Sequence, residues 1–316
     1  MQNKFIYRAF RLRRAILLGG LLPLVPLLIC STLPFFNGSI DLTVLFTCWA
    51  ANTGFVGVLM TWFPGAWSEV LRLTWSYTIA IFVVIGLAVL MQAEGRNLNN
   101  NVLIGFAVGW GLCTLIIFFV ILGSFEHLRK RRLRKPYVMR GSIWIDAAVD
   151  TVYETLRLKE ETENWDRQYI RVEKVKDAPP TFRSDLRVKD LDPETLKIID
   201  DTFSVFSILV ETRKNEGETI VCQDDEGTVS ETYTFVVKPE ESGTRLITES
   251  ITQDLSVIDA IQFWLCDYMA DNDFHKKEQI EGLAPIAVRS VGQQAFITIR
   301  LLQLLGKILP KDDTPF

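Results

Sequence analysis

Long apolar stretches separated by short polar breaks fill the first 124 residues of the chain. Four of these stretches contain no charged side chain, and the shortest has 21 residues. About 20 helical residues cross the hydrocarbon core of a bilayer, whereas a helix on the surface of a water-soluble protein carries a polar stripe. The pattern therefore predicts an α-helical transmembrane domain. Its four spans are expected near residues 15–36, 42–63, 74–92 and 102–124.

Basic side chains gather on both flanks of this region, in residues 1–14 and in a juxtamembrane linker at 125–139. The linker contains six of them: Arg129, Lys130, Arg131, Arg132, Arg134 and Lys135. Positive residues collect on the cytoplasmic side of a membrane, so we expect a multi-pass protein of the plasma or inner membrane with both termini in the cytoplasm. We expect these six side chains to contact anionic lipid headgroups. A nucleic-acid partner is not expected, because an acidic region follows.

The predicted spans carry no ionisable side chain, which a transport pathway would need. Asn52 and Thr53 form their most polar part, and we interpret them as a hydrogen bond between helices. The spacing of Gly105 and Gly109 predicts a close approach of the last span to a neighbour. The region is therefore interpreted as a packed anchor.

The pattern changes at Arg140. "GSIWIDA" and "TFRSDLRVKD" alternate with period two, as half-buried strands do, while "AVDTVYETLRLKEETENW" has helical spacing with Asp150 as its expected N-cap. Further strands are expected at 195–212 and 218–223, followed by the hairpin "SETYTFVVKPEESGTRLITESI" and one helix over 257–282. Antiparallel strands followed by one long helix indicate an α+β fold.

Two stretches carry a family resemblance. "IWIDAAVDTVYETLRLKEETENW" resembles the opening of the START-like or SRPBCC superfamily, which includes polyketide cyclase/dehydrase and lipid-transport proteins, and "YTFVVKPEESGTRLITES" is similar to its final hairpin. The resemblance covers residues 140–283. It implies a helix-grip fold, in which a curved antiparallel sheet wraps around a long C-terminal helix. It also implies an apolar cavity that takes a lipid, sterol, polyketide or other small hydrophobic ligand.

Large side chains of this domain are candidates to line that cavity. They are Trp165, Phe182, Leu186, Phe203, Tyr233, Phe235, Trp264 and Tyr268. Each is also a candidate for the ordinary hydrophobic core, but the polar tips of Tyr and Trp suit an amphipathic ligand in an apolar pocket.

The tail, residues 284–316, has the pattern of a basic amphipathic helix, with Arg300 and Lys307 on its polar stripe. Such a helix lies on the inner leaflet or docks on the domain, and the pattern leaves both alternatives open.

Signs of catalysis or metal binding are few. Of the two histidines, His127 ends the fourth predicted span and His275 is expected to be exposed near the end of the last helix. No C-x-x-C motif occurs among the five cysteines, so neither zinc nor a redox pair is indicated. "DNDFHKKEQIEG" lacks the glycine and the glutamate of a calcium loop. We therefore expect no metal, no cofactor and no catalytic residue.

Charge separates the two halves of the chain. Residues 1–140 hold 14 Lys and Arg and four acids, so they carry +10, and residues 141–316 carry −14 of the total of −4. The main hypothesis is a membrane-anchored protein whose cytoplasmic domain binds a hydrophobic ligand, above all a lipid. One alternative is a tethered sensor or scaffold that recruits a protein partner through the acidic domain. Another is an enzyme resembling polyketide cyclases.

Overall fold

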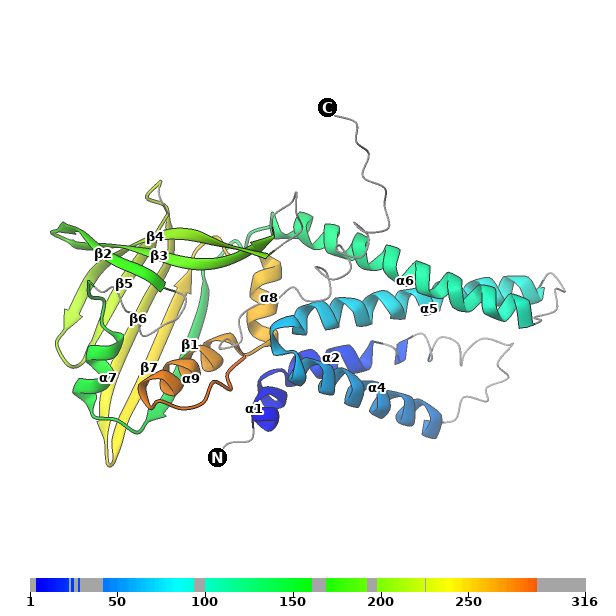
Figure 1. The fold of residues 1–316 in the computed structure, drawn as a ribbon, viewed down its shortest axis with the longest axis horizontal. Helices are drawn as coiled ribbons and strands as arrows, with labels where there is room; N and C mark the ends of the chain where they lie inside the picture. Colours follow the sequence, from blue (N-terminus) through cyan, green and yellow to red (C-terminus); the bar gives the residue numbers. More distant parts are fainter. Residues whose placement is uncertain are drawn as a thin grey trace. The chain divides into compact units, whose positions relative to one another are not determined.

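The computed structural model describes residues 4–22, 24–25, 28, 42–93, 100–160, 169–191, 198–224 and 226–288. The chain divides into a helical unit, made mainly from Met1–Lys130, and a sheet unit, made mainly from Arg131–Val291 (Figure 1).

Helices account for the described secondary structure of the first unit. They are α1 (Lys4–Arg11), α2 (Arg13–Leu21), α4 (Leu42–Trp62), the short 3-10 helix η2 (Pro64–Ala66), α5 (Trp67–Ala93) and α6 (Asn100–Arg129). The helices expected near 42–63, 74–92 and 102–124 are confirmed as helices. α2 covers the start of the one expected at 15–36, most of whose remainder lies outside the described residues. Within the described ranges, none of the helices is both long and apolar enough to cross a membrane, so the prediction of four spans is not supported.

Packing in the helical unit depends on one amide and one glycine. The Asn52 side chain on α4 donates from Nδ2 to the Gly19 carbonyl on α2 (3.1 Å) and accepts at Oδ1 from the Tyr77 hydroxyl on α5 (2.6 Å). This confirms the hydrogen bond between helices expected of Asn52, whereas the buried Thr53 hydroxyl has no hydrogen-bond partner among the described residues. A Cβ on Gly20 would lie 2.0 Å from Thr53 Oγ1. By contrast, a Cβ on Gly109 would meet no described atom within 4 Å. Helix α6 lies along α5, but Gly109 is not the point of closest contact, and the surroundings of Gly105 lie outside the described residues.

The sheet unit is a seven-stranded antiparallel sheet in the order β1-β7-β6-β5-β4-β3-β2. Its strands are β1 (Tyr137–Ile145), β2 (Tyr169–Asp177), β3 (Pro180–Leu191), β4 (Ile198–Arg213), β5 (Gly217–Gln223), β6 (Val229–Glu240) and β7 (Gly243–Thr252). All strands after β1 follow one another in chain order across the sheet, and β1 pairs with β7 at the far edge. The expected strand order and final hairpin are confirmed.

Three helices complete the unit: α7 (Val149–Leu156), α8 (Val257–Leu265) and α9 (Tyr268–Ile280). The N-cap of α7 is Ala148, not the expected Asp150, which lies in the first turn, where its charge suits the helix dipole. The single helix expected over 257–282 is also wrong. It breaks before α9 at Asp267, whose backbone is left-handed with φ 53°, a conformation that a continuous helix of L-residues cannot include.

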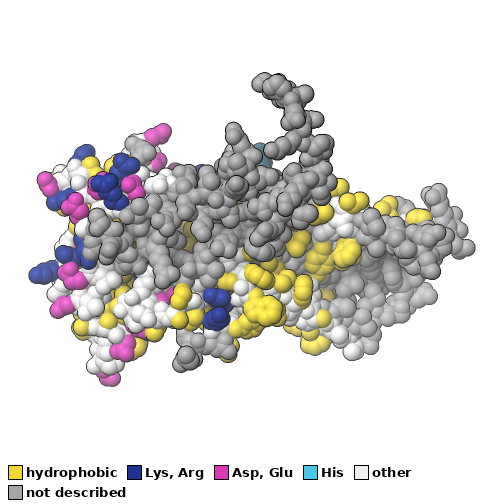
Figure 2. Space-filling view, in the orientation of Figure 1, with side chains coloured by type: hydrophobic (Ala, Val, Ile, Leu, Met, Phe, Trp, Pro, Cys, Tyr) yellow, Lys and Arg dark blue, Asp and Glu magenta, His cyan; other side chains and the backbone are white. Residues whose placement is uncertain are grey.

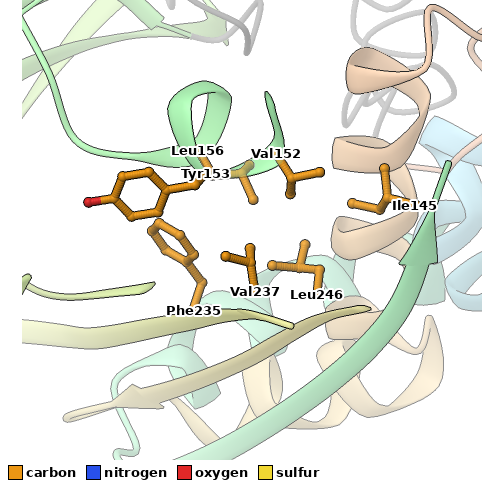
Figure 3. Packing of buried hydrophobic residues seen from close by; sticks show 7 residues of the cluster. All are labelled: Ile145, Val152, Tyr153, Leu156, Phe235, Val237 and Leu246. Atoms are coloured by element: carbon orange, nitrogen blue, oxygen red, sulfur yellow. The ribbon is translucent and has the colours of Figure 1, made fainter. Parts of the chain in front are cut away.

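The apolar core lies where α7 packs on β6 and β7. Seven buried side chains form it: Ile145, Val152, Tyr153, Leu156, Phe235, Val237 and Leu246. Figure 3 shows the α7 side chains directed toward those of the strands, with the Tyr153 ring near the Phe235 ring at a centroid distance of 6.2 Å. Burial of such side chains is worth roughly 1.5–3 kcal/mol each, so this cluster holds α7 on the sheet.

Helix α9 lies against β1. Contact is close at Gly141, where an added Cβ would lie 2.0 Å from Asp273 Oδ2. The absent side chain therefore lets a polar residue of the helix reach the sheet. A curved antiparallel sheet with its C-terminal helix laid across it fits the helix-grip fold, and the predicted fold of this unit is confirmed.

Candidate functional site

The face of the sheet toward α7 and α9, called here the interior face, follows from the strand register. Tyr233, Phe235 and Val237 alternate along β6 toward it, and Tyr233 is paired with Ser250 on β7 and with Ile220 on β5. Directly paired residues of antiparallel strands point to the same side. The register therefore extends this face from β1 across to β3.

One end of the interior face is apolar and closes on α7. At its margin Glu218 is buried on β5, accepting from the Leu158 backbone N–H (2.8 Å) and the Tyr153 hydroxyl (3.2 Å). Burial raises the pKa of Glu218, and the two hydrogen bonds act in the opposite direction. Burial and the neighbouring Glu218 carboxylate raise the pKa of Tyr153 to about 12. Glu218 thus fastens the end of α7 to β5.

A polar patch of the interior face adjoins this apolar part and lies under α9. Thr248 donates to Asp273 Oδ2 (2.7 Å), and Asp273 Oδ1 is 3.6 Å from Lys276 Nζ. Lys276 also donates to the Tyr233 hydroxyl and lies 4.5 Å from the centre of that ring. Thr248, Asp273 and Lys276 are all buried. Buried charges require such pairing, so the network holds α9 in one position on the sheet.

Polar side chains continue along the same face toward β4. The Ser250 hydroxyl donates to Glu231, and Cys222 Sγ lies 3.9 Å from Ser207 Oγ. Burial, with a smaller effect of Glu231, raises the pKa of Cys222 to about 11. The thiol therefore stays protonated near neutral pH and acts as a small apolar group.

Ser184 on β3 is the polar group that most suggests a ligand. It is 2% exposed, and its hydroxyl oxygen has no hydrogen-bond partner in the described structure. Phe182, two residues earlier on the same face, is also buried. An unsatisfied buried hydroxyl is costly, and a bound molecule with a polar atom at this point would remove the cost.

The opposite side of α9 holds the segment after it. Glu278 Oε1 accepts from the Ile286 and Ala287 N–H groups (2.7 and 2.8 Å), and Asp271 Oδ1 accepts from Val288 N–H (3.0 Å). His275 is 7% exposed and contacts Gln279 through its ring nitrogen. The expectation of an exposed His275 is therefore wrong, because the returning segment covers this side of the helix.

The structure places four of the residues expected to line a cavity on the interior face. They are Phe182, Tyr233, Phe235 and Phe203, which pairs with Leu186 in the register and is 54% exposed. The Leu186 side chain and Trp165 lie outside the described residues.

The two remaining candidates lie at the break between helices. Trp264 on α8 is 54% exposed, and Tyr268 begins α9 with its ring stacked on Phe263 at 4.3 Å. A lining role for either stays a prediction.

Sequence reasoning missed Thr248, Asp273 and Lys276. A signal for Thr248 was available, because the period-two pattern of β7 places it on the same face as Leu246. Nothing in the sequence marks Asp273 or Lys276 as buried, since α9 has mostly polar side chains and no wide apolar stripe.

The basic linker residues lie at the surface near the start of the sheet unit. Lys130, Arg131, Arg132, Arg134 and Lys135 are exposed, as is Arg129 at the end of α6. Arg300 and Lys307 lie outside the described residues. Contact of these eight side chains with lipid stays a prediction.

A small depression of about 80 Å³ lies over β4, β5 and β6, near Gly217 and Glu218. Ligand pockets are typically about 300–1,000 Å³, so this depression is too small for a lipid. Across the described residues, no group of three or more His, Cys, Asp or Glu side chains is arranged to hold a metal ion.

Comparison with known proteins gives likeness in structure alone. No known protein family matches the chain, and no curated protein matches it. The di-domain ARO/CYC protein StfQ from the steffimycin biosynthetic pathway is 11% identical with a TM-score of 0.36, covering 57% of this chain and 59% of its own. The Polyketide_cyc-like protein Cgl2372 from Corynebacterium glutamicum is 16% identical with a TM-score of 0.27, covering 58% and 100%.

Ara h 8.0201 is 9% identical with a TM-score of 0.36, covering 46% of this chain and 96% of its own. These identities and scores are low. The fold assignment therefore rests on the strand order and on the placement of α9 described above.

Proposed function

We propose that the sheet unit binds an amphipathic ligand, a lipid above all, on its interior face, and that the helical unit attaches the protein to a membrane. The observation that carries the ligand proposal is the buried Ser184 hydroxyl, which has no hydrogen-bond partner among the described residues and lies beside buried Phe182 on the interior face. A polar atom of the ligand suits Ser184, and an acyl chain or ring system suits the apolar side chains of the same face, such as Phe182 and Phe203.

The surface of the helical unit supports attachment to a membrane. Large apolar side chains are exposed on its helices, among them Phe46, Phe55, Trp62, Ile116 and Val120. On the face seen in Figure 2, hydrophobic side chains gather over the helical unit and charged side chains over the sheet unit. Apolar surface of this extent marks a lipid or protein contact. In its more specific form, the proposal is that the helical unit crosses the membrane with the four spans predicted from the sequence.

Mass spectrometry of organic extracts of the purified full chain tests the ligand proposal. We expect a lipid or another amphipathic compound in stoichiometric amount. In Ser184→Ala, one hydrogen bond of about 1 kcal/mol is lost, so retention of the compound should fall about fivefold. Folding should be unaffected, because the hydroxyl is unsatisfied without a ligand.

Ser142→Ala, on the exposed side of β1, is the matched control and should retain the compound fully. An extract free of any such compound, together with no uptake of labelled phospholipid from vesicles, would refute ligand binding. Washing the vesicles with alkaline carbonate tests membrane insertion separately, because only an inserted chain stays with them.

A further inference from the structure

Helix α8 exposes a row of large apolar side chains on the sheet unit. Val257, Ile261 and Trp264 are 37%, 47% and 54% exposed. Their spacing of four and three residues places them on one face of the helix. Ile258 and Leu265 are buried, so α8 is apolar both on its buried face and on its more exposed face.

A basic segment is joined to the start of this helix by backbone hydrogen bonds. Arg131 O accepts from Val257 N–H (3.0 Å), and Leu133 N–H donates to Leu255 O (2.9 Å). Arg132 pairs with Ser256 as an isolated antiparallel bridge. Its guanidinium donates to the Asp254 carbonyl (2.9 Å). The basic segment is therefore a fixed part of the sheet unit.

We call these two features together the α8 platform: the exposed side chains of Val257, Ile261 and Trp264, and the exposed basic residues of 131–135, whose backbone is bonded to the start of α8. Isolated exposed apolar side chains are ordinary on a protein surface. A short apolar row with a tryptophan, next to a basic segment joined to the start of the helix, is instead the composition of helices that lie at the surface of an anionic membrane.

The charge on the rest of the sheet unit also favours an approach to an anionic membrane with the α8 platform first. Residues 141–316 carry −14 in total, whereas Arg131, Arg132, Arg134 and Lys135 are positive. An anionic surface repels acidic faces and attracts the platform, which fixes which side of a protein approaches it.

We propose that the α8 platform docks the sheet unit on an anionic bilayer surface, with Ile261 and Trp264 at the level of the lipid headgroups. The inference rests on the membrane attachment proposed above but not on ligand binding. Docking of this kind brings the sheet unit to the lipid from which an amphipathic ligand would be drawn.

Hydroxyl-radical footprinting of Trp264 tests the docking. The full chain is reconstituted in vesicles of phosphatidylcholine alone or of phosphatidylcholine with phosphatidylserine, and oxidation of the peptide containing Trp264 is followed by mass spectrometry. We expect the oxidation rate to fall about threefold or more in the anionic vesicles, because the headgroups then shield a side chain that is otherwise half exposed.

Paired variants identify the cause of any protection. Arg134→Glu/Lys135→Glu removes two attractive charges, at about a factor of five each, adds two repulsive ones, and should restore fast oxidation of Trp264. Val257→Ser/Ile261→Ser should also restore it. The matched controls are Lys214→Glu/Lys238→Glu and Val175→Ser/Val210→Ser, which change exposed residues elsewhere on the sheet and should leave the protection unchanged.

Two results would overturn the proposal. Equal oxidation of Trp264 in neutral and anionic vesicles would show that anionic lipid does not cover the platform. Protection of Trp264 that persists in both platform variants would show that neither the basic residues nor the apolar row causes it. If the chain stays with carbonate-washed vesicles while Trp264 remains reactive, docking alone has failed. If the chain does not associate with vesicles at all, the proposed attachment has failed.

Discussion

The helical unit and the sheet unit distribute apolar and polar side chains in opposite ways. Helices α4 and α6 expose side chains such as Phe46, Trp62 and Ile116, and α2, α4 and α5 share the Asn52 hydrogen bonds between them. The sheet unit exposes charges and encloses an apolar cluster around Phe235. It also encloses the charged pair of Asp273 and Lys276.

The two units therefore differ in packing. The helical unit brings α2 and α4 close together at Gly20 while large apolar side chains stay exposed, and the sheet unit buries an apolar cluster. The exposed apolar row on α8 departs from the pattern of the sheet unit, as do single exposed side chains such as Val175 and Val210.

Phe235→Ala has the largest expected effect on stability, because it removes a side chain from the apolar core cluster. Phe235 is fully buried against Tyr153, and truncation of a buried phenylalanine costs about 3–5 kcal/mol. Urea unfolding of the full chain, followed by hydrogen exchange in β6, should show that loss. Phe203→Ala, on an exposed site, should cost less than about 1 kcal/mol. Equal effects of the two changes would contradict the assigned core.

Gly20→Leu tests the close contact of the helical unit. A Cβ there would lie 2.0 Å from Thr53 Oγ1, so we expect α2 to be displaced from α4 at a cost of about 1–3 kcal/mol. The midpoint of thermal unfolding in detergent measures this loss of stability. Gly109→Leu, where a Cβ meets no atom of the described residues within 4 Å, should leave the midpoint unchanged or raise it. A lower midpoint for Gly109→Leu than for Gly20→Leu would show that the close helix contact lies at Gly109 and not at Gly20.

Glu218→Gln tests the buried carboxyl. Its expected effect on the free energy of unfolding is smaller than that of the two changes above and depends on pH. Burial raises the pKa of Glu218 above its ordinary value of 4.5. In the pH range between that value and the raised one, the folded state holds a proton that the unfolded state has released, so stability falls as pH rises through this range.

The glutamine variant should lose this part of the pH dependence, and urea midpoints measured across the range compare the two proteins. Glu216→Gln, on a neighbouring exposed residue, should keep the pH dependence of the original chain. Identical pH profiles for the Glu218 variant and the original chain would show that this carboxyl does not titrate abnormally.

Cys222 should differ from an ordinary thiol in reactivity and not in stability. Burial raises its pKa to about 11, so at pH 8 only about one molecule in a thousand carries the reactive thiolate. Iodoacetamide should therefore label Cys222 slowly in the folded chain and at an ordinary rate in urea. Rapid labelling of the folded chain would place this thiol outside the protected interior.

The alternating strands and the final hairpin were predictable because a half-buried strand repeats every two residues. Phe182, Tyr233 and Phe235 could be identified as candidates for the same reason. Asp273, Lys276 and His275 could not, since their burial depends on β1, β7 and the segment after α9. The break at Asp267 was hidden because the apolar spacing of three and four residues continues across it.

By itself the sequence determined the secondary structure of the sheet, the separation of charge between the two units and the apolar character of the first. These depend on periodicity and composition, which are local. Only the tertiary structure decided that α9 encloses charged side chains, that Ser184 faces the interior with no partner among the described residues, and that the basic linker joins α8. Each of these depends on residues far apart in the chain meeting across the sheet, and no local pattern records such a meeting.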